Sequence, residues 1–368
     1  MSEQKILTQR QKMVHAFFKN KLGLIGMVIL TVLYLLVIFA GFISPYNMTT
    51  MHNNYIYIPP VHIHFFDREG HFHMVPFVYG LKQVRNPVTF AMERKIDFTK
   101  RYPIHFLAKG EEWSFFGLFK SNVHLFGLGP DAKMMLALFG TDKYGRDLFS
   151  RVLYGGQVSM SVGLIGVAIS LVLGALIGSI SGYFGGTVDL IIQRLIELLM
   201  SFPRLPLWLA LSMIIPPSWP STWVYFGVVT VLSFLGWMGV ARVVRGMVLS
   251  LREREFVLAA KLVGQSNLRI IWRHIIPNVM GYLIVVATLS IPGMILGESA
   301  LSFLGLGIKE PMASWGLLLS GAQSISSIAL YPWLMIPGIF IVITVLAFTF
   351  LGDSLRDTLD PYKVAKRS

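Results

Sequence analysis

The chain has 368 residues, 54% of them apolar and only 14% charged, and its mean hydropathy is +0.62; because soluble domains carry about a quarter charged residues, this composition indicates a polytopic membrane protein. The absence of cysteine excludes a disulfide, a thiolate metal site and a cysteine nucleophile. The net charge of +13 includes basic clusters beside apolar segments, a pattern typical of the cytoplasmic side of membrane proteins that argues against nucleic-acid binding.

The first apolar segment, Leu22–Ile43, is uncharged and exceeds the roughly 20 residues that a helix needs to cross a bilayer. Residues 1–21 carry five Lys or Arg and one Glu, so we expect the N-terminus on the cytoplasmic side. The segment is longer than the apolar part of a signal peptide, and no small-residue cleavage site follows it. We therefore predict a retained span within a first region of residues 1–46.

Residues 47–135 are too many for an ordinary loop and are rich in aromatic side chains, which predicts a small folded insertion outside the membrane. Within it, Val61–Phe66 and His71–Phe77 flank a four-residue connection, a pattern that favours a β-hairpin. This connection would place His64 opposite His73, and imidazoles at that spacing can bind zinc or nickel. A partly exposed polar strand face without a metal is the interpretation that we favour.

The segment 136–157 leads into the next span, and we expect Asp142, Arg146 and Asp147 to form a polar network at its entrance. Five more segments are apolar and long enough to cross the membrane, which predicts an all-α protein with six spans and a cytoplasmic C-terminus. These segments are Val158–Phe184, Val188–Ile214, Thr222–Val244, Val279–Glu298 and Trp333–Leu351.

Charged side chains inside spans are costly, so each needs a partner or an aqueous surface. Arg194 and Glu197 lie three residues apart in the third span and are predicted to form a structural ion pair at a helix interface, with Asp189 joining them. Glu298 closes the fifth span and is interpreted as an anchor for the loop that follows. Three glycines spaced four residues apart in the second span predict close packing against another helix.

Residues 246–277 form a basic loop between the fourth and fifth spans. The stretch from 242 to 274 carries seven Lys or Arg and two Glu, which places the loop in the cytoplasm. Gly264 fits the end of one short helix, and Ser266 or Asn267 fits the start of another.

We expect these two helices to meet at an angle, with the small residues Ala259 and Ala260 at the turn, and Pro277 to open the fifth span. Apolar residues at helical spacing make the first helix amphipathic; they are Leu258, Ala259, Leu262 and Val263. We expect these two helices to form a protruding knob that enters a cleft on a soluble partner. An amphipathic helix lying on lipid headgroups is the alternative.

The same loop carries a recognisable pattern. Ala259 and Ala260, then three residues and Gly264, and further on Ile276-Pro277, resemble the signature loop of bacterial ABC importer permeases, in which Glu-Ala-Ala, three residues and Gly form a helix docked on the ATPase. The Glu of that pattern is replaced by Leu258 here, and Glu255 stands one turn earlier as its substitute.

Four further segments in the same order resemble the second, C-type permease subunit of the dipeptide, oligopeptide and nickel importer family. They begin at the residues before the first span and end after the last one, and they leave out 47–135. The segments are Phe18–Leu22, Gly140–Arg151, Glu298–Gly307 with Ser314–Gly316, and Leu351–Pro361.

The resemblance implies the fold of a type I importer permease, with a transmembrane core at 158–361, a coupling loop at 246–277 and a cytoplasmic tail at 362–368. It implies a multi-pass protein of the inner membrane that works with a second homologous permease, two ATPase subunits and an extracytoplasmic substrate-binding protein. Our hypothesis is that the insertion contacts that binding protein or shields the pore mouth.

No nucleophile–base pair and no phosphate-binding Gly-rich loop with Lys appears in the sequence, so we expect no catalytic residue and no cofactor in this chain. ATP and magnesium would be used by the partner subunits. Peptides are the expected substrate, and nickel chelates and oligosaccharides stay open. A secondary transporter working without ATP is the alternative from another class, but neither inverted repeats nor chains of intramembrane carboxylates support it.

Overall fold

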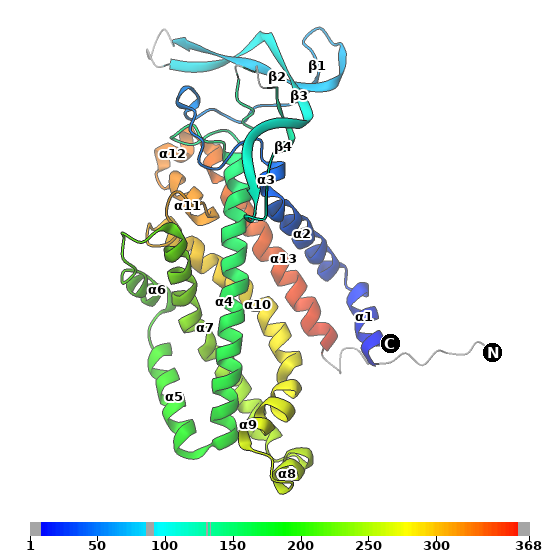
Figure 1. The fold of residues 1–368 in the computed structure, drawn as a ribbon, viewed down its shortest axis with the longest axis vertical. Coiled ribbons are helices and arrows are strands. Elements are labelled where there is room, and N and C mark those ends of the chain that lie inside the picture. Colours follow the sequence, from blue (N-terminus) through cyan, green and yellow to red (C-terminus); the bar gives the residue numbers. More distant parts are fainter. Residues whose placement is uncertain (1–8, 86–91, 130–131, 133, 360–368) are drawn as a thin grey trace, which may run out of the picture. The chain divides into compact units, whose positions relative to one another are not determined.

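The computed structural model describes residues 9–85, 92–129, 132 and 134–359 (Figure 1). The chain divides into two compact units. Three of the boundaries between these units fall inside long helices, so the units do not coincide with the regions expected from the sequence. The first unit comprises Met1–Leu33, Ser159–Ile308 and Ile341–Ser368, and the second comprises Tyr34–Val158 and Lys309–Phe340.

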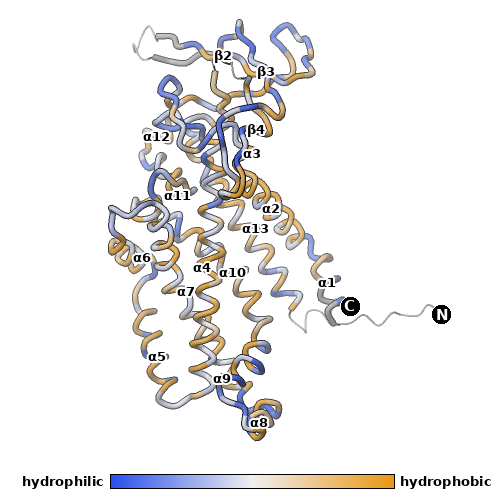
Figure 2. The backbone as a smooth tube through the Cα atoms, in the orientation of Figure 1, coloured by the Kyte–Doolittle hydropathy of each residue, from blue (hydrophilic) through white to orange (hydrophobic). Residues whose placement is uncertain are grey.

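Long apolar helices dominate the chain, and Figure 2 shows hydrophobic residues in orange recurring along them between paler, less hydrophobic ones. Among the described residues, five helical segments are long and apolar enough to span a membrane, and a bent pair makes a sixth if it is counted as one span. The predicted multi-span helical protein is therefore confirmed. The main helices are α1 (Gln9–Lys19), α2 (Lys21–Ile38), α4 (Leu148–Phe184), α5 (Gly186–Met200), α6 (Arg204–Ser212), α7 (Ser221–Leu251), α10 (Ile276–Phe303) and α13 (Ile336–Leu359).

The expected third span, Val188–Ile214, is two helices rather than one. Helix α5 ends at Met200, α6 begins at Arg204, and their axes differ in direction by 89°. Pro203 lies at the break; proline cannot donate a backbone hydrogen bond and disfavours a helical conformation of the residue before it. The prediction of an unbroken span missed this effect.

Helices α4 and α7 pack closely in the first unit. A Cβ atom on Gly182 would lie 2.7 Å from the carbonyl oxygen of Arg245, and one on Gly174 would lie 2.8 Å from that of Trp237. Side chains at these positions would force the helices apart. The close packing predicted from the glycine spacing is confirmed.

Glu298 is fully buried near the end of α10. Its carboxylate accepts hydrogen bonds from Ser159 Oγ at 2.8 Å and from Ser302 Oγ at 2.6 Å. Ser302 Oγ in turn accepts a bond from the backbone N–H of Ile308 at 2.9 Å. The carboxylate thereby holds the loop that follows α10, as the sequence predicted.

The second unit contains a four-stranded antiparallel sheet in the order β1-β2-β3-β4. It is larger than the single hairpin expected from the sequence. Its apolar side packs on residues that follow the last strand, including Met134 and Leu136. The strands are β1 (His64–Phe66), β2 (Phe72–Arg85), β3 (Met92–Phe115) and β4 (Phe119–Leu128).

Short helices complete both units. In the second unit, Trp315 Nε1 donates to Val152 O at 2.9 Å and Trp333 Nε1 donates to Thr141 O at 3.0 Å, so residues after 308 are tied to the segment that leads into α4. The short elements are α3 (Ala40–Ile43), η1 (Asn53–Tyr55), α8 (Glu255–Leu262), α9 (Asn267–Ile270), the π-helical η2 (Ile271–Ile275), α11 (Trp315–Leu319), η3 (Ser320–Ala322), α12 (Ile325–Leu330) and η4 (Pro332–Met335).

The expected pairing of His64 with His73 is wrong. Phe66 pairs with Phe72, and a register shift in β1 then places His64 opposite Phe77. The connection is one residue longer than expected, and the irregular register moves the two imidazoles out of line.

Candidate functional site

The loop at 246–277 is held firmly at its base by helices of the first unit. Arg252 Nη1 donates to the carbonyl oxygen of Gly182 at 3.2 Å, and Tyr183 Oη donates to Asn267 Oδ1 at 2.9 Å. The ammonium group of Lys261 lies 4.9 Å from the ring centre of Tyr183, within the range of a cation–π interaction. The loop is therefore fixed to the end of α4.

Gly264 ends helix α8 through its backbone. Its φ of +80° is the left-handed conformation, which favours glycine. The N–H of Gly264 bonds to Lys261 O at 2.9 Å and that of Gln265 to Ala260 O at 3.1 Å, the pair of bonds that defines a Schellman cap. Among the described residues an added Cβ would meet nothing within 4 Å, so backbone conformation and not space restricts this position.

Ser266 occupies the N-cap position of the next helix, α9, but its side chain makes no capping bond within the described part of the chain. Pro277 lies in the first turn of α10, where a proline is compatible with a helix. Glu255 lies exposed in the first turn of α8, where the helix dipole favours a carboxylate. Two helices with a glycine between them are thus present, as the sequence predicted.

Helix α8 has one buried and one exposed apolar side. Val257 and Ala260 are buried against a core that includes Ile270 and Ile275. The opposite side is apolar yet faces away from the core, and we call it the coupling face. It comprises Leu258 (46% exposed), Ala259 and Leu262 (89%) of α8 and Val263 (80%) directly after the helix; Leu268 (62%) of α9 is exposed as well.

The sequence predicted Ala259 and Ala260 at the turn between the helices, but both lie within α8. The chain turns at residues 263–266 instead, because the helix continues until the left-handed Gly264 stops it. Ala260 faces the core and Ala259 faces outward. Ala260 therefore packs against the core of this chain, whereas Ala259 is left on the exposed side of the helix.

The three charged residues expected to cluster in the third span, Asp189, Arg194 and Glu197, belong to two separate ion pairs in the structure. Arg194 Nη1 donates to Glu197 Oε2 at 2.8 Å, but both side chains are more than half exposed in this chain rather than packed at a helix interface. Asp189 does not join them; Arg245 of α7 donates to both its carboxylate oxygens, and Ser181 Oγ donates to it as well. Sequence spacing revealed only the local pair, because the other pair requires α5 and α7 to be neighbours.

The hairpin of the second unit carries a small polar cluster around Asp67. His73 Nε2 lies 3.0 Å from its Oδ2, and Arg101 Nη1 donates to the same oxygen at 3.0 Å. The hydrogen bond from His73 holds the pKa of Asp67 below its usual value. Asp67, Glu69 and His71 bring potential metal-ligand atoms within 4.8 Å of one another. Arg101 already supplies a positive charge there, so the cluster is satisfied without a cation.

The segment leading into α4 contains an ion-pair network in which the arginines are buried and Glu310 is 42% exposed at the side chain. Arg146 Nε donates to Asp142 Oδ2 at 2.8 Å, and its Nη atoms donate to both oxygens of Glu310 at 2.9 Å. Arg151 donates to the same two carboxylates. The expected pair of Asp142 and Arg146 is confirmed, whereas sequence analysis missed Glu310 because it lies far along the chain.

Asp147, expected in that network, instead begins helix α4. Its Oδ2 accepts bonds from the N–H of Ser150 at 2.7 Å and from Ser150 Oγ at 2.6 Å, whereas its Oδ1 is buried and has no hydrogen-bond partner among the described residues. Burial raises the pKa of Asp147 to about 7. This carboxyl group takes a proton more readily than an exposed aspartate does.

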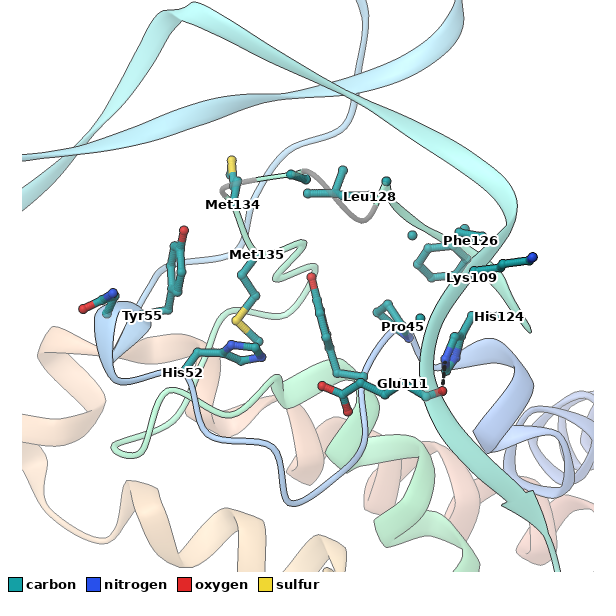
Figure 3. A pocket seen from close by; sticks show the side chains of 17 residues that line it. Pro45, His52, Tyr55, Lys109, Glu111, His124, Phe126, Leu128, Met134 and Met135 are labelled. Carbon is teal, nitrogen blue, oxygen red and sulfur yellow. Dashed lines mark hydrogen bonds between the residues drawn. The ribbon is translucent and has the colours of Figure 1, made fainter. Parts of the chain in front are cut away.

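The second unit also contains a pocket of about 710 Å³, shown in Figure 3. Glu111 lies on its wall near His124, and Glu111 Oε2 accepts bonds from the N–H of Asn47 and from Thr50 Oγ1, both at 2.7 Å. His124 Nε2 is 2.9 Å from the carbonyl oxygen of Glu111. These bonds tie β3 to the segment after α3, so we assign the polar groups a structural role.

The helical spans and the two short helices at one end of α7 and α10 define a multi-pass membrane transport component. Residues 174–363 match the model of the binding-protein-dependent transport system inner membrane component, and residues 8–60 match the N-terminal TM domain of oligopeptide transport permease C. The chain belongs to the family of binding-protein-dependent transport system inner membrane components. It is a transport subunit and not an enzyme.

Curated relatives agree with this assignment. The chain is 45% identical over 224 residues to the oligopeptide transport system permease protein OppC of Haemophilus influenzae, covering 61% of this chain and 70% of the relative. It is 46% identical over 224 residues to OppC of Escherichia coli K12 (61% and 72%). It is 41% identical over 225 residues to the dipeptide transport system permease protein DppC of Bacillus subtilis (61% and 68%). The sheet of the second unit lies between the two matched family regions.

Proposed function

We propose that this chain is the C-type permease of an ATP-driven peptide importer in the inner membrane, forming half of its translocation pathway. The names of its relatives support peptides over nickel chelates and oligosaccharides as the substrate. A second homologous permease supplies the other half. An external binding protein delivers the peptide, and two ATPase subunits use ATP and magnesium.

The coupling face is the observation that carries the mechanism. Leu262 and Val263 are among the most exposed apolar side chains of the described residues, yet they sit on a helix whose other side is fixed to the core. Exposed apolar patches of this kind mark sites of protein–protein contact. We assign the coupling face to a groove on the ATPase subunit, with both chain termini on the same, cytoplasmic side.

ATP-driven closure of the two ATPase subunits moves this knob and, through its rigid base, the ends of α4, α7 and α10. The permease thereby alternates between outward and inward opening as a rigid-body switch. Glu255, Ala259 and Gly264 act here as parts of the docking surface and its shape. The sheet of the second unit lies on the external side, where it contacts the binding protein or shields the pore mouth.

The test replaces Leu262 with Asp in the assembled importer. Burying a carboxylate in an apolar groove without a partner is costly, so we expect at least about tenfold weaker retention of the ATPase subunits during purification and loss of peptide-stimulated ATP hydrolysis. Leu118→Asp is the matched control, because Leu118 is 79% exposed in the second unit and should retain the ATPase. Full retention and coupling in Leu262→Asp would refute the docking assignment.

Substrate and sidedness need separate measurements. Uptake into proteoliposomes should be saturable with short peptides and unaffected by nickel chelates or oligosaccharides. The chain has no cysteine, so a single cysteine introduced by Leu262→Cys can report its side of the membrane in sealed vesicles. Labelling from the external side by an impermeant reagent would overturn the topology.

A further inference from the structure

A cavity of about 290 Å³ lies inside the helical unit, between α4, α6, α7 and α10. Its walls come from the middle of the long helices: around Ser170 in α4, Gly239 in α7 and Ser290 in α10. A span needs roughly 20 residues to cross the hydrocarbon core, so the middle of helices this long lies at membrane depth. The fourth wall comes from α6, beyond the break in the bent span.

Arg204, the first residue of α6, is the one charged residue among the described residues that line this cavity. No Asp or Glu contributes to the lining, and within the described parts of the chain no carboxylate forms an ion pair with Arg204. A guanidinium group stays charged in proteins and is costly at membrane depth unless it meets water or an anion. Arg204 follows the bend at Pro203 and, although it is exposed in this chain, lines the cavity.

Trp208 follows Arg204 by one helical turn, and both line the cavity. The indole Nε1 of Trp208 is buried and, among the residues that the structure describes, has no hydrogen-bond partner. An atom the size of water cannot reach this N–H in the structure, so Trp208 does not offer it to a ligand in the cavity. Among the described lining residues, Arg204 alone supplies a charged donor to the cavity, and a guanidinium group is suited to a carboxylate.

Part of the cavity wall lacks side chains. Among the described residues, a Cβ atom added to Gly239 or Gly293 would meet nothing within 4 Å. This part of the wall leaves room for side chains of different sizes, whereas bulky residues such as Tyr282 and Met294 line other parts. A passing ligand would therefore be recognised by a feature that is independent of its side chains.

We propose that Arg204 binds the C-terminal carboxylate of a peptide as it passes the middle of the membrane. This carboxylate is common to all unmodified peptides, and a guanidinium group can bind it with two parallel hydrogen bonds. Side chains of different sizes then face the part of the wall at Gly239 and Gly293. The inference rests on the proposed peptide-import function and adds a contact site within the pathway.

The first experiment measures the charge preference of the cavity. Ser290→Cys provides the sole thiol in the chain of the assembled importer, and its labelling rate is measured with an anionic and a cationic thiol reagent of similar size. We expect Arg204→Gln to lower the ratio of anionic to cationic rates by about tenfold, because a single cation in a low-dielectric cleft concentrates anions. Arg204→Lys should keep most of the preference.

Arg194→Gln is the matched control. It removes the same charge from the same bent span, but Arg194 does not line the cavity and already pairs with Glu197. It should leave the ratio unchanged. An equal fall in Arg194→Gln, an unchanged ratio in Arg204→Gln, or a thiol at position 290 that never reacts would each overturn the inference.

The second experiment identifies the source of the carboxylate. A short peptide with apolar side chains and a free C-terminus, at millimolar concentration, should slow the labelling of the thiol at position 290 when Arg204 is present but not in the Arg204→Gln variant. The same peptide with an amidated C-terminus should not protect, and neither should an amidated peptide with a glutamate side chain. Protection by the amidated peptide with a glutamate side chain would mean that the cavity binds any carboxylate, and this result would overturn the proposal.

Uptake separates this inference from the proposed function. If the unmodified importer does not take up peptides, the proposed function fails whatever the labelling shows. If it takes them up and Arg204→Gln does so at the same rate and half-saturating concentration as Arg204→Lys, the function stands and the carboxylate site does not.

Discussion

The segment leading into α4 and the coupling loop are both rich in charged residues, yet they are built in opposite ways. In the lead-in segment Arg146 and Arg151 are almost fully buried and paired with carboxylates. In the coupling loop the basic residues are largely exposed, and an apolar face lies open beside them. A network completed within the chain supports the fold, whereas an apolar face left open is available for a partner.

The largest effect should come from breaking the ion-pair network of the lead-in segment. Arg146→Met leaves Glu310 without its two bonds from Arg146 and removes one partner of Asp142. Breaking a buried pair typically costs roughly 3–5 kcal/mol, and the remaining bonds from Arg151 to both carboxylates place this variant toward the lower value. We expect a strongly lowered unfolding temperature and poor recovery from the membrane, measured by thermal unfolding in detergent. Arg252→Met in the coupling loop is the contrasting variant, and equal losses in both would contradict the comparison.

A second effect in the same segment depends on pH. Asp147 titrates near pH 7 when folded but near its ordinary value of 3.8 when unfolded. Between these values the folded state holds a proton that the unfolded state has released, so stability falls as pH rises from about 4 to about 7. The loss is at most about 4 kcal/mol, from the size of the shift. Unfolding temperatures at pH 5 and pH 8 should differ less in Asp147→Asn than in the unmodified chain.

Within the coupling loop, the two sides of α8 should respond differently to shortening. Val257 is fully buried, so Val257→Ala should cost about 2 kcal/mol of stability. Leu262→Ala should change stability by less than about 0.5 kcal/mol, because the side chain is 89% exposed, but should lower peptide-stimulated ATP hydrolysis. Thermal unfolding and ATPase assays on both variants distinguish a core position from a docking position.

Gly264 offers a sharper test, because Gly305 is its matched control. Both have a φ of +80°, and at both an added Cβ meets nothing within 4 Å among the described residues. Replacing either with Ala should cost about 1–2 kcal/mol through the left-handed backbone alone. Only Gly264→Ala should also reduce the coupling of ATP hydrolysis to transport, and Gly264→Asn should restore part of it. Equal coupling in the two alanine variants would assign Gly264 a purely structural role.

The sequence predicted the spans, the two-helix loop and the place of Gly264 because each depends on residues close together in the chain. Helical spacing around Leu258 and a glycine six residues later are local signals. The pairing of Glu310 with Arg146 depends instead on segments more than 150 residues apart. The register of His64 depends on an irregularity within β1, for which hydrophobic alternation gives no signal.

The coupling face was visible in the sequence only as a helical stripe. Periodicity marks the apolar side of a helix but does not say whether that side faces the core. Here Val257 and Ala260 face inward, and the more apolar stripe at Leu258 and Leu262 faces outward. Its exposure could be recognised only after the packing of α8 was known.

The smallest effect concerns the two ion pairs of α5. Arg194 and Glu197 are 74% and 54% exposed at the side chain, and an exposed pair at this spacing contributes only about 0.2–0.5 kcal/mol. Asp189 is 15% exposed, and its carboxylate accepts bonds from Arg245 of α7. We therefore expect Arg194→Gln to leave the unfolding temperature nearly unchanged and Asp189→Asn to lower it clearly. The reverse order would mean that Arg194 and Glu197 are buried against another subunit in the assembled importer, and comparing the free chain with the assembly would show this directly.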